Sequence, residues 1–83
     1  MKKQERQEIE TKIRELMSLV FRLDQGEIDE ATTSNSVRNW DSLQHMNLIA
    51  LIEDEFDIQL QPSQINKMNS FLNIIEEVYL SLH

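Results

Sequence analysis

Glycine and proline are almost absent from this chain of 83 residues, which has one of each, Gly26 and Pro62. These residues form the tight turns between strands, so their scarcity favours helices over a strand-and-turn architecture. Apolar residues recur along most of the chain at intervals of three and four, the spacing of one helix face. The sequence therefore predicts an all-α fold, and its length allows one domain over residues 1–83.

The apolar spacing predicts three main helices and one short helix, over about residues 4–23, 42–57, 62–67 and 71–82. Asp41 and Ser70 are suitable N-caps for two of them, and Pro62 suits the first position of the short helix. Gly26 is expected to be the left-handed residue that ends the first helix.

The helices are expected to form a bundle around one shared core, made of Ile9, Ile13, Leu16, Val20, Leu48, Ile49, Ile52, Phe56, Ile65, Phe71, Ile75 and Tyr79. In the last helix Leu72, Val78 and Leu82 also belong to the apolar face. On the wet side of the first helix, Glu8–Lys12 and Glu10–Arg14 are ion pairs at the favourable i,i+4 spacing.

Residues 24–41 are a long polar connection between the first two main helices. Its few apolar residues, Ile28, Ala31, Val37 and Trp40, are expected to pin it to the core. Trp40 is interpreted mainly as such an anchor, and the alternative is that it flanks a docking site. A loop of this length in a small domain is often functional.

Composition excludes several classes of function. The net charge is −7, which argues against nucleic-acid binding. There is no cysteine, and His45 and His83 are too few for a histidine-rich metal site, so neither a metal nor a thiolate nucleophile is expected. No apolar run is long enough to span a membrane, and the N-terminus has no signal-peptide pattern. A small acidic cytoplasmic binding module is expected, rather than a self-sufficient enzyme.

The acidic residues gather towards the end of the second main helix. Residues 24–83 carry a net charge of −9 while residues 1–23 carry +2. Glu53, Asp54, Glu55 and Asp57 lie close together at the negative pole of that helix. This cluster is either a solvated face or a docking surface for basic partners.

The most informative stretch is Asn39-Trp40-Asp41-Ser42-Leu43, followed by HMNLIALIEDEFDI. It places Ser42 in the first turn of an amphipathic helix, where unpaired backbone N–H groups and the positive helix pole favour an attached phosphate. His45 lies one turn further on and could form a Ser–His pair with Ser42. A hydrolytic site is disfavoured, because the chain lacks a Gly-x-Ser-x-Gly elbow and has little protein to build a pocket. His45 is therefore interpreted as a structural residue of the helix.

This stretch resembles acyl carrier proteins, through the Asp41-Ser42-Leu43 triplet, the helical run to Glu53-Asp54-Glu55-Phe56 and the following Asp57-Ile58. Length and element order match as well, so the resemblance covers nearly the whole chain. It implies a four-helix acyl-carrier-like bundle without catalytic activity of its own. It also implies that a separate phosphopantetheinyl transferase attaches 4′-phosphopantetheine from coenzyme A to Ser42. The thiol of this arm carries an acyl group as a thioester, so the chain needs no cysteine.

The resemblance further implies a partner-binding face on the second main helix, made of Asp41, Leu43, Met46, Ala50, Glu53 and Asp54. Leu43 and Met46 are accordingly expected to be exposed. The partners are the transferase and enzymes that load, modify or transfer the acyl group, and a monomer is expected for such a shuttle. The small core could also leave space between helices for an acyl chain.

The sequence departs from common fatty-acid carriers near the serine. Gln44 and Asn47 stand where acidic residues are usual, and Asn39-Trp40 replaces a glycine and a small residue. These differences favour a specialised carrier in a dedicated pathway, fatty-acid, polyketide or other. The alternative function is an unmodified helical adaptor that binds basic proteins through its acidic second helix. A metal-buffering role is disfavoured, because the loop lacks the EF-hand ligand pattern.

Overall fold

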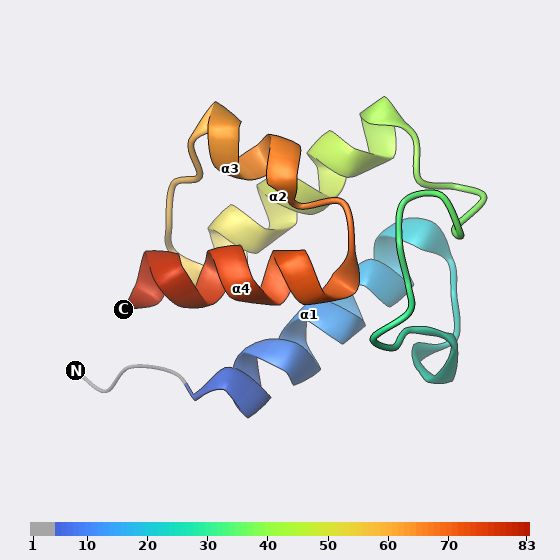
Figure 1. Ribbon diagram of the computed structural model, residues 1–83, viewed down its shortest axis with the longest axis horizontal. Coiled ribbons are helices and arrows are strands. Elements are labelled where there is room, and N and C mark those ends of the chain that lie inside the picture. The colour runs from blue at the N-terminus through green and yellow to red at the C-terminus, as the bar shows by residue number, and fades with distance from the viewer. Residues whose placement is uncertain (1–4) are drawn as a thin grey trace.

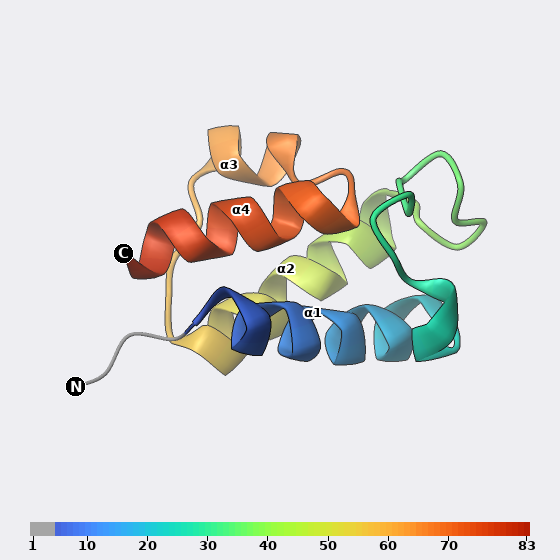
Figure 2. The same cartoon turned by 60° about the horizontal axis from the view of Figure 1, so that its bottom comes forward.

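The computed structural model describes residues 5–83, which form a bundle of helices as predicted. The elements are α1 (Arg6–Phe21), a 3-10 turn η1 (Gln25–Glu27), α2 (Ser42–Phe56), α3 (Pro62–Lys67) and α4 (Phe71–Leu82). α1 packs against both α2 and α4, and α3 packs on α4 (Figures 1 and 2). The long connection 22–41 lies at one end of the bundle (Figure 1). No helix within residues 5–83 is long and apolar enough to cross a membrane.

The predicted starts of α2, α3 and α4 are confirmed. Asp41 caps α2, accepting a hydrogen bond from the Gln44 amide at 2.8 Å. Ser70 caps α4 in the same way, with the Asn73 amide at 3.1 Å. Pro62 is the first residue of α3, where its missing N–H costs nothing. These local signals identify the helix starts without help from tertiary packing.

The predicted end of the first helix is wrong. α1 covers Arg6–Phe21 rather than residues 4–23, and residue 4 lies outside the described part of the chain. Its left-handed cap is Arg22, with a φ of 58°, rather than Gly26. The cause is Asp24, which starts the new turn η1 with its own capping box and so places Gly26 inside that turn.

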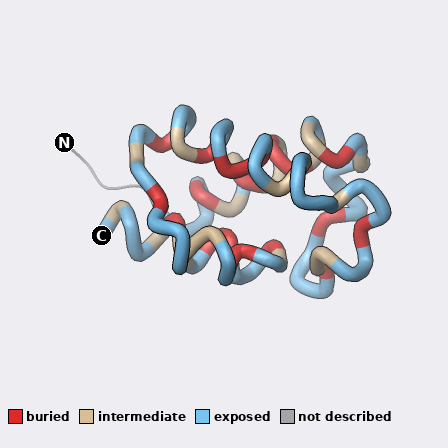
Figure 3. Tube along the Cα trace, turned by 90° about the horizontal axis from the view of Figure 1, so that it is seen from above, coloured by how far each residue is buried: buried red, intermediate tan, exposed pale blue. Residues whose placement is uncertain are grey.

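The core lies along the faces that the helices turn towards one another (Figure 3). Of the twelve predicted core residues, nine are buried, and Val20, Ile65 and Tyr79 are half-buried against the others. Leu72, expected on the inner face of α4, is 42% exposed, and its place is taken by the fully buried Ile74. The buried face of α4 is therefore rotated slightly from the predicted one, because Phe71 and Ile74 define it.

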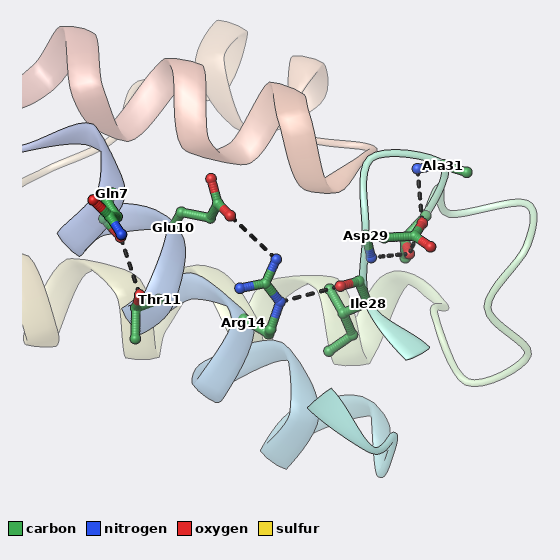
Figure 4. A network of polar contacts seen from close by, with 8 residues as sticks. Gln7, Glu10, Thr11, Arg14, Ile28, Asp29 and Ala31 are labelled. Atoms are coloured by element: carbon green, nitrogen blue, oxygen red, sulfur yellow. Dashed lines mark hydrogen bonds and ion pairs between the residues drawn. The ribbon is translucent and has the colours of Figure 1, made fainter. Parts of the chain in front are cut away.

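The connection 22–41 is pinned to the bundle by side chains from both parts. Ile28 and Val37 are buried as predicted, whereas Ala31 is exposed. Arg14 of α1 donates from Nε to the carbonyl of Ile28 at 3.1 Å, and its guanidinium lies 4.8 Å from the centre of the Phe71 ring. Figure 4 shows how Arg14 reaches from α1 to this connection. One charged side chain thus joins α1, the connection and α4.

The two predicted ion pairs of α1 have different outcomes. Arg14 contacts Glu10 at 3.3 Å, as expected (Figure 4). Lys12 contacts Glu15 at 3.4 Å and Glu55 of α2 at 3.7 Å, rather than Glu8. Glu8 instead accepts the Glu5 amide in a capping box at the start of α1. The pairing of Lys12 follows from the packing of α1 on α2.

The connection also meets the start of α4 through its backbone. The amide of Ser34 donates to the carbonyl of Asn69 at 2.9 Å, and the amide of Phe71 donates to the carbonyl of Thr32 at 3.0 Å. These bonds bring residues 32–34 next to residues 69–71 at the end of the bundle where α2 begins (Figure 1).

Candidate functional site

Ser42 is the first residue of α2 and is exposed to solvent. Its position follows from two neighbours, because Asp41 starts the helix and the preceding connection is held in place by Trp40. Two other serines at a helix start or turn differ from it. Ser70 and Ser36 use their hydroxyl groups in hydrogen bonds to nearby backbone, whereas the Ser42 hydroxyl makes none with residues 5–83.

The backbone around Ser42 presents free donors. Asp41 takes two amides of the first turn, Gln44 through its carboxylate and His45 through its carbonyl. The amides of Ser42 and Leu43 have no acceptor within residues 5–83. Unpaired amides at the positive end of a helix attract an anion such as a phosphodiester. The residues around Ser42 therefore fit a phosphate group linked to the serine oxygen.

Trp40 anchors the connection, as predicted. Its ring stacks on the buried Phe21 of α1, with 4.6 Å between ring centres. Its indole N–H donates to Nδ1 of His45 at 3.0 Å. The neighbouring Asn39 donates from its side chain to the carbonyl of Phe21 at 3.0 Å. Both residues before Asp41 are thus fixed to the end of α1, which holds the start of α2 in position.

His45 is a structural residue, as predicted, with a defined tautomer. An indole N–H can only donate, so Nδ1 of His45 must be the unprotonated acceptor. Nε2 then carries the proton and lies 3.0 Å from the carbonyl oxygen of Ile65 in α3, to which it donates. Because both ring nitrogens are bonded elsewhere, His45 does not serve as a base for Ser42. The geometry therefore speaks against the Ser–His pair considered from the sequence.

The outer surface of α2 carries a stripe of exposed side chains, which we call the α2 stripe: Leu43, Met46, Ala50 and Asp54. The predicted exposure of Leu43 and Met46 is confirmed, at 71% and 50% of their surface. Their spacing of three and four places them on one helix face with Ala50 and Asp54. Large apolar side chains left in water on one face are typical of an interaction surface.

The acidic end of α2 is only partly free. Glu53 is half-buried and accepts the amide of the buried Leu60 at 2.9 Å. Glu55 contacts Lys12, and Asp57 is the left-handed cap of α2 with a φ of 55°. Asp54 is exposed and makes no ion pair or side-chain hydrogen bond within residues 5–83. Glu53 and Glu55 thus have structural partners, and a basic partner protein would meet chiefly the exposed carboxylates of Asp54 and Asp57.

The structure also places three polar residues near Ser42 that sequence reasoning missed. Ser34, Asn66 and Asn69 line a surface hollow together with Ser42, Trp40, His45 and Ile65. They come from the connection, the end of α3 and the turn before α4. Nothing in their local sequence distinguishes them from ordinary turn residues, so only the tertiary contacts of the connection could identify them.

Comparison with known proteins supports the same conclusion as the geometry. The family model described as "phosphopantetheine attachment site" matches residues 11–78, which is most of the chain and includes Ser42. No curated protein matches the chain. Carrier domains of this family are generally not catalytic, and they interact with a phosphopantetheinyl transferase and acyl-handling enzymes. The chain belongs to the phosphopantetheine attachment-site family, and it is a carrier protein for covalently bound 4′-phosphopantetheine.

Proposed function

We propose that Ser42 is the attachment residue and that the chain is an acyl carrier protein of a specialised biosynthetic pathway. The observation that carries the proposal is the free Ser42 hydroxyl at the start of α2, beside two unpaired amides and within the matched segment. The family assignment favours this function over an unmodified adaptor. The missing acidic residues at Gln44 and Asn47 support a dedicated pathway rather than general fatty-acid synthesis.

In the attachment reaction this chain contributes the nucleophilic hydroxyl group, and one bond forms while one bond breaks. The Ser42 Oγ forms a bond with the phosphorus on the pantetheine side of coenzyme A. The phosphoanhydride bond to the nucleotide half breaks, and the serine proton goes to a base of the transferase. The amides of Ser42 and Leu43 favour the resulting phosphodiester anion. When bound, the cofactor supplies a thiol that carries the acyl group as a thioester.

We assign the partner-binding role to the α2 stripe together with Asp41 and Glu53. The small apolar patch of Leu43 and Met46 lies one turn or less from Ser42, so a transferase that reaches the serine would contact it. The negative charge of the chain speeds encounter with a basic partner, and the limited apolar area allows rapid release. Rapid release also suits a carrier that works as a monomer.

The intact mass tests the attachment residue directly. The chain is incubated with coenzyme A, Mg²⁺ and a broad-specificity transferase, in parallel with Ser42→Ala and Ser63→Ala. Ser63 is a matched control because it is an exposed serine in the first turn of α3. Wild type and Ser63→Ala should gain one phosphopantetheine unit and Ser42→Ala none. A gain in Ser42→Ala would disprove the assignment, and no gain in any variant would favour the adaptor.

The docking role of the α2 stripe is tested by the rate of the same loading reaction. Leu43→Ala and Met46→Ala should raise KM for the carrier about tenfold, because truncating an apolar anchor of an interface costs one to two kcal/mol. Leu19→Ala is the control, since Leu19 is 74% exposed on α1, away from the stripe. An equal KM for all three variants would remove the stripe from the docking surface.

A further inference from the structure

The hollow beside Ser42 has a volume of about 240 Å³ and lies between α2, α3 and the long connection. Its rim is polar, with Ser34, Asn66 and Asn69, and Ser42 opens onto it. Anything attached to Ser42 has this hollow as its nearest recess. An acyl chain on Ser42 could enter the core only if this recess continued inwards.

The half-buried residues that line the hollow, Trp40, His45 and Ile65, are joined by two hydrogen bonds. Trp40 donates to His45, and His45 donates to the carbonyl oxygen of Ile65, each at 3.0 Å. Together the two hydrogen bonds link the connection to the first turn of α2, and the first turn of α2 to α3. The His45–Ile65 bond is the hydrogen bond of a side chain that joins α2 to α3 within residues 5–83, so it lies across the seam between these two helices beside Ser42.

The residues behind this bridge are tightly packed. Ile49 lies one turn after His45 on the same helix face and is 1% exposed. Phe21, on which Trp40 stacks, is fully buried, as are Ile52 and Val78. An alkyl chain entering here would have to break both hydrogen bonds and displace these side chains. The space between helices that the sequence allowed is therefore closed at its entrance beside Ser42.

We propose that the Trp40–His45–Ile65 bridge keeps the acyl cargo outside the helix bundle, and that the chain carries short or polar acyl groups. This inference rests on the proposed attachment at Ser42. His45 is the specificity-determining residue, because its ring fills the seam and joins its two sides. A long alkyl chain held in water is unfavourable, whereas a short or polar group loses little by staying exposed.

The rim of the hollow supports a polar occupant. The Asn66 side chain makes no hydrogen bond within residues 5–83, and Asn69 uses only its Oδ1, which accepts from Asn73 at 3.1 Å. The amide N–H groups of both asparagines can therefore donate to carbonyl or hydroxyl oxygens. Such groups occur in the amide-containing arm and in polar acyl groups, but not in an alkyl chain.

The test compares wild type charged with butyryl, octanoyl and dodecanoyl groups from the corresponding acyl-coenzyme A. We expect Tm to differ by less than about 2 °C across the series, whereas a buried dodecanoyl chain would raise Tm by about 10 °C or more. His45→Ala opens the seam, so its Tm should rise with chain length. Asn47→Ala, an exposed neighbour on α2, is the control and should behave as wild type. A length-dependent rise in wild type would overturn the proposal.

A second measurement keeps the proposal testable if His45→Ala does not fold. Amide and indole NMR shifts of wild type are compared between the unloaded, butyryl and dodecanoyl forms. Loading should shift Asn66, Asn69 and the Trp40 indole, and lengthening the acyl chain should leave Ile49 and Val78 unchanged. Shifts at these core residues would overturn the proposal while leaving Ser42 as the attachment site. Failure to load Ser42, seen first by mass, would instead overturn the proposed function and this inference together.

Discussion

The two ends of α2 use polar residues in opposite ways. At the first end, Asp41, Trp40 and His45 are all engaged in hydrogen bonds, and the Ser42 hydroxyl between them is left free. At the other end a charged side chain itself holds the fold, because Glu53 accepts the amide of Leu60, while Glu55 adds only an exposed ion pair with Lys12. The comparison shows that the number of polar residues in a segment does not tell how many are available to a partner.

The largest effect on the free energy of unfolding is expected at Trp40, which anchors the N-terminal end of α2. Trp40→Ala removes the stack on Phe21 and the hydrogen bond to His45, and should lower the free energy of unfolding by about 2–3 kcal/mol. Urea unfolding measures this loss. Leu43→Ala is the control, since it removes a mostly exposed side chain from the same end and should change stability by less than about 0.5 kcal/mol. Equal losses would mean that the anchoring of this end does not depend on Trp40.

The second prediction separates two neighbouring acidic residues at the other end. Glu53→Ala leaves the amide of the buried Leu60 without an acceptor and should cost about 1–2 kcal/mol in urea unfolding. Asp54→Ala removes an exposed charge at the negative pole of α2 and should be neutral or slightly stabilising. The same loss in both variants would contradict the structural role of Glu53.

A substitution at the C-terminal cap of α2 is expected to raise the free energy of unfolding rather than lower it. Asp57 holds a left-handed backbone conformation that glycine adopts without steric cost. Asp57→Gly should therefore raise the free energy of unfolding by about 0.5–1 kcal/mol. Asp57→Ala is the matched control, because it also removes the charge but keeps the Cβ atom, and it should not stabilise. A gain from both variants would assign the effect to charge rather than to backbone conformation.

Sequence reasoning recovered what depends on local signals. The helix starts at Asp41, Pro62 and Ser70 follow from short segments. The exposure of Leu43 and Met46 was expected from the family resemblance, which rests on nearly the whole chain. It failed where a second local signal competes or where a distant residue decides. Arg22 rather than Gly26 ends α1, because a second capping box begins at Asp24. The His45 bridge depends on α3, twenty residues further along the chain, so no local pattern could reveal it.

The smallest effect is expected at the ion pair that joins α2 to α1. Glu55 and Lys12 are about 3.7 Å apart, and both side chains are 41% exposed, so water and salt screen their attraction. Glu55→Gln should therefore change the free energy of unfolding by less than about 0.5 kcal/mol, with little dependence on salt. Urea unfolding at low and high salt checks this, with Glu53→Ala measured alongside as the variant that removes the acceptor of the Leu60 amide. If Glu55→Gln were the more costly variant at low salt, the second end of α2 would be held by charge contacts with α1 rather than by the bond of Glu53 to Leu60.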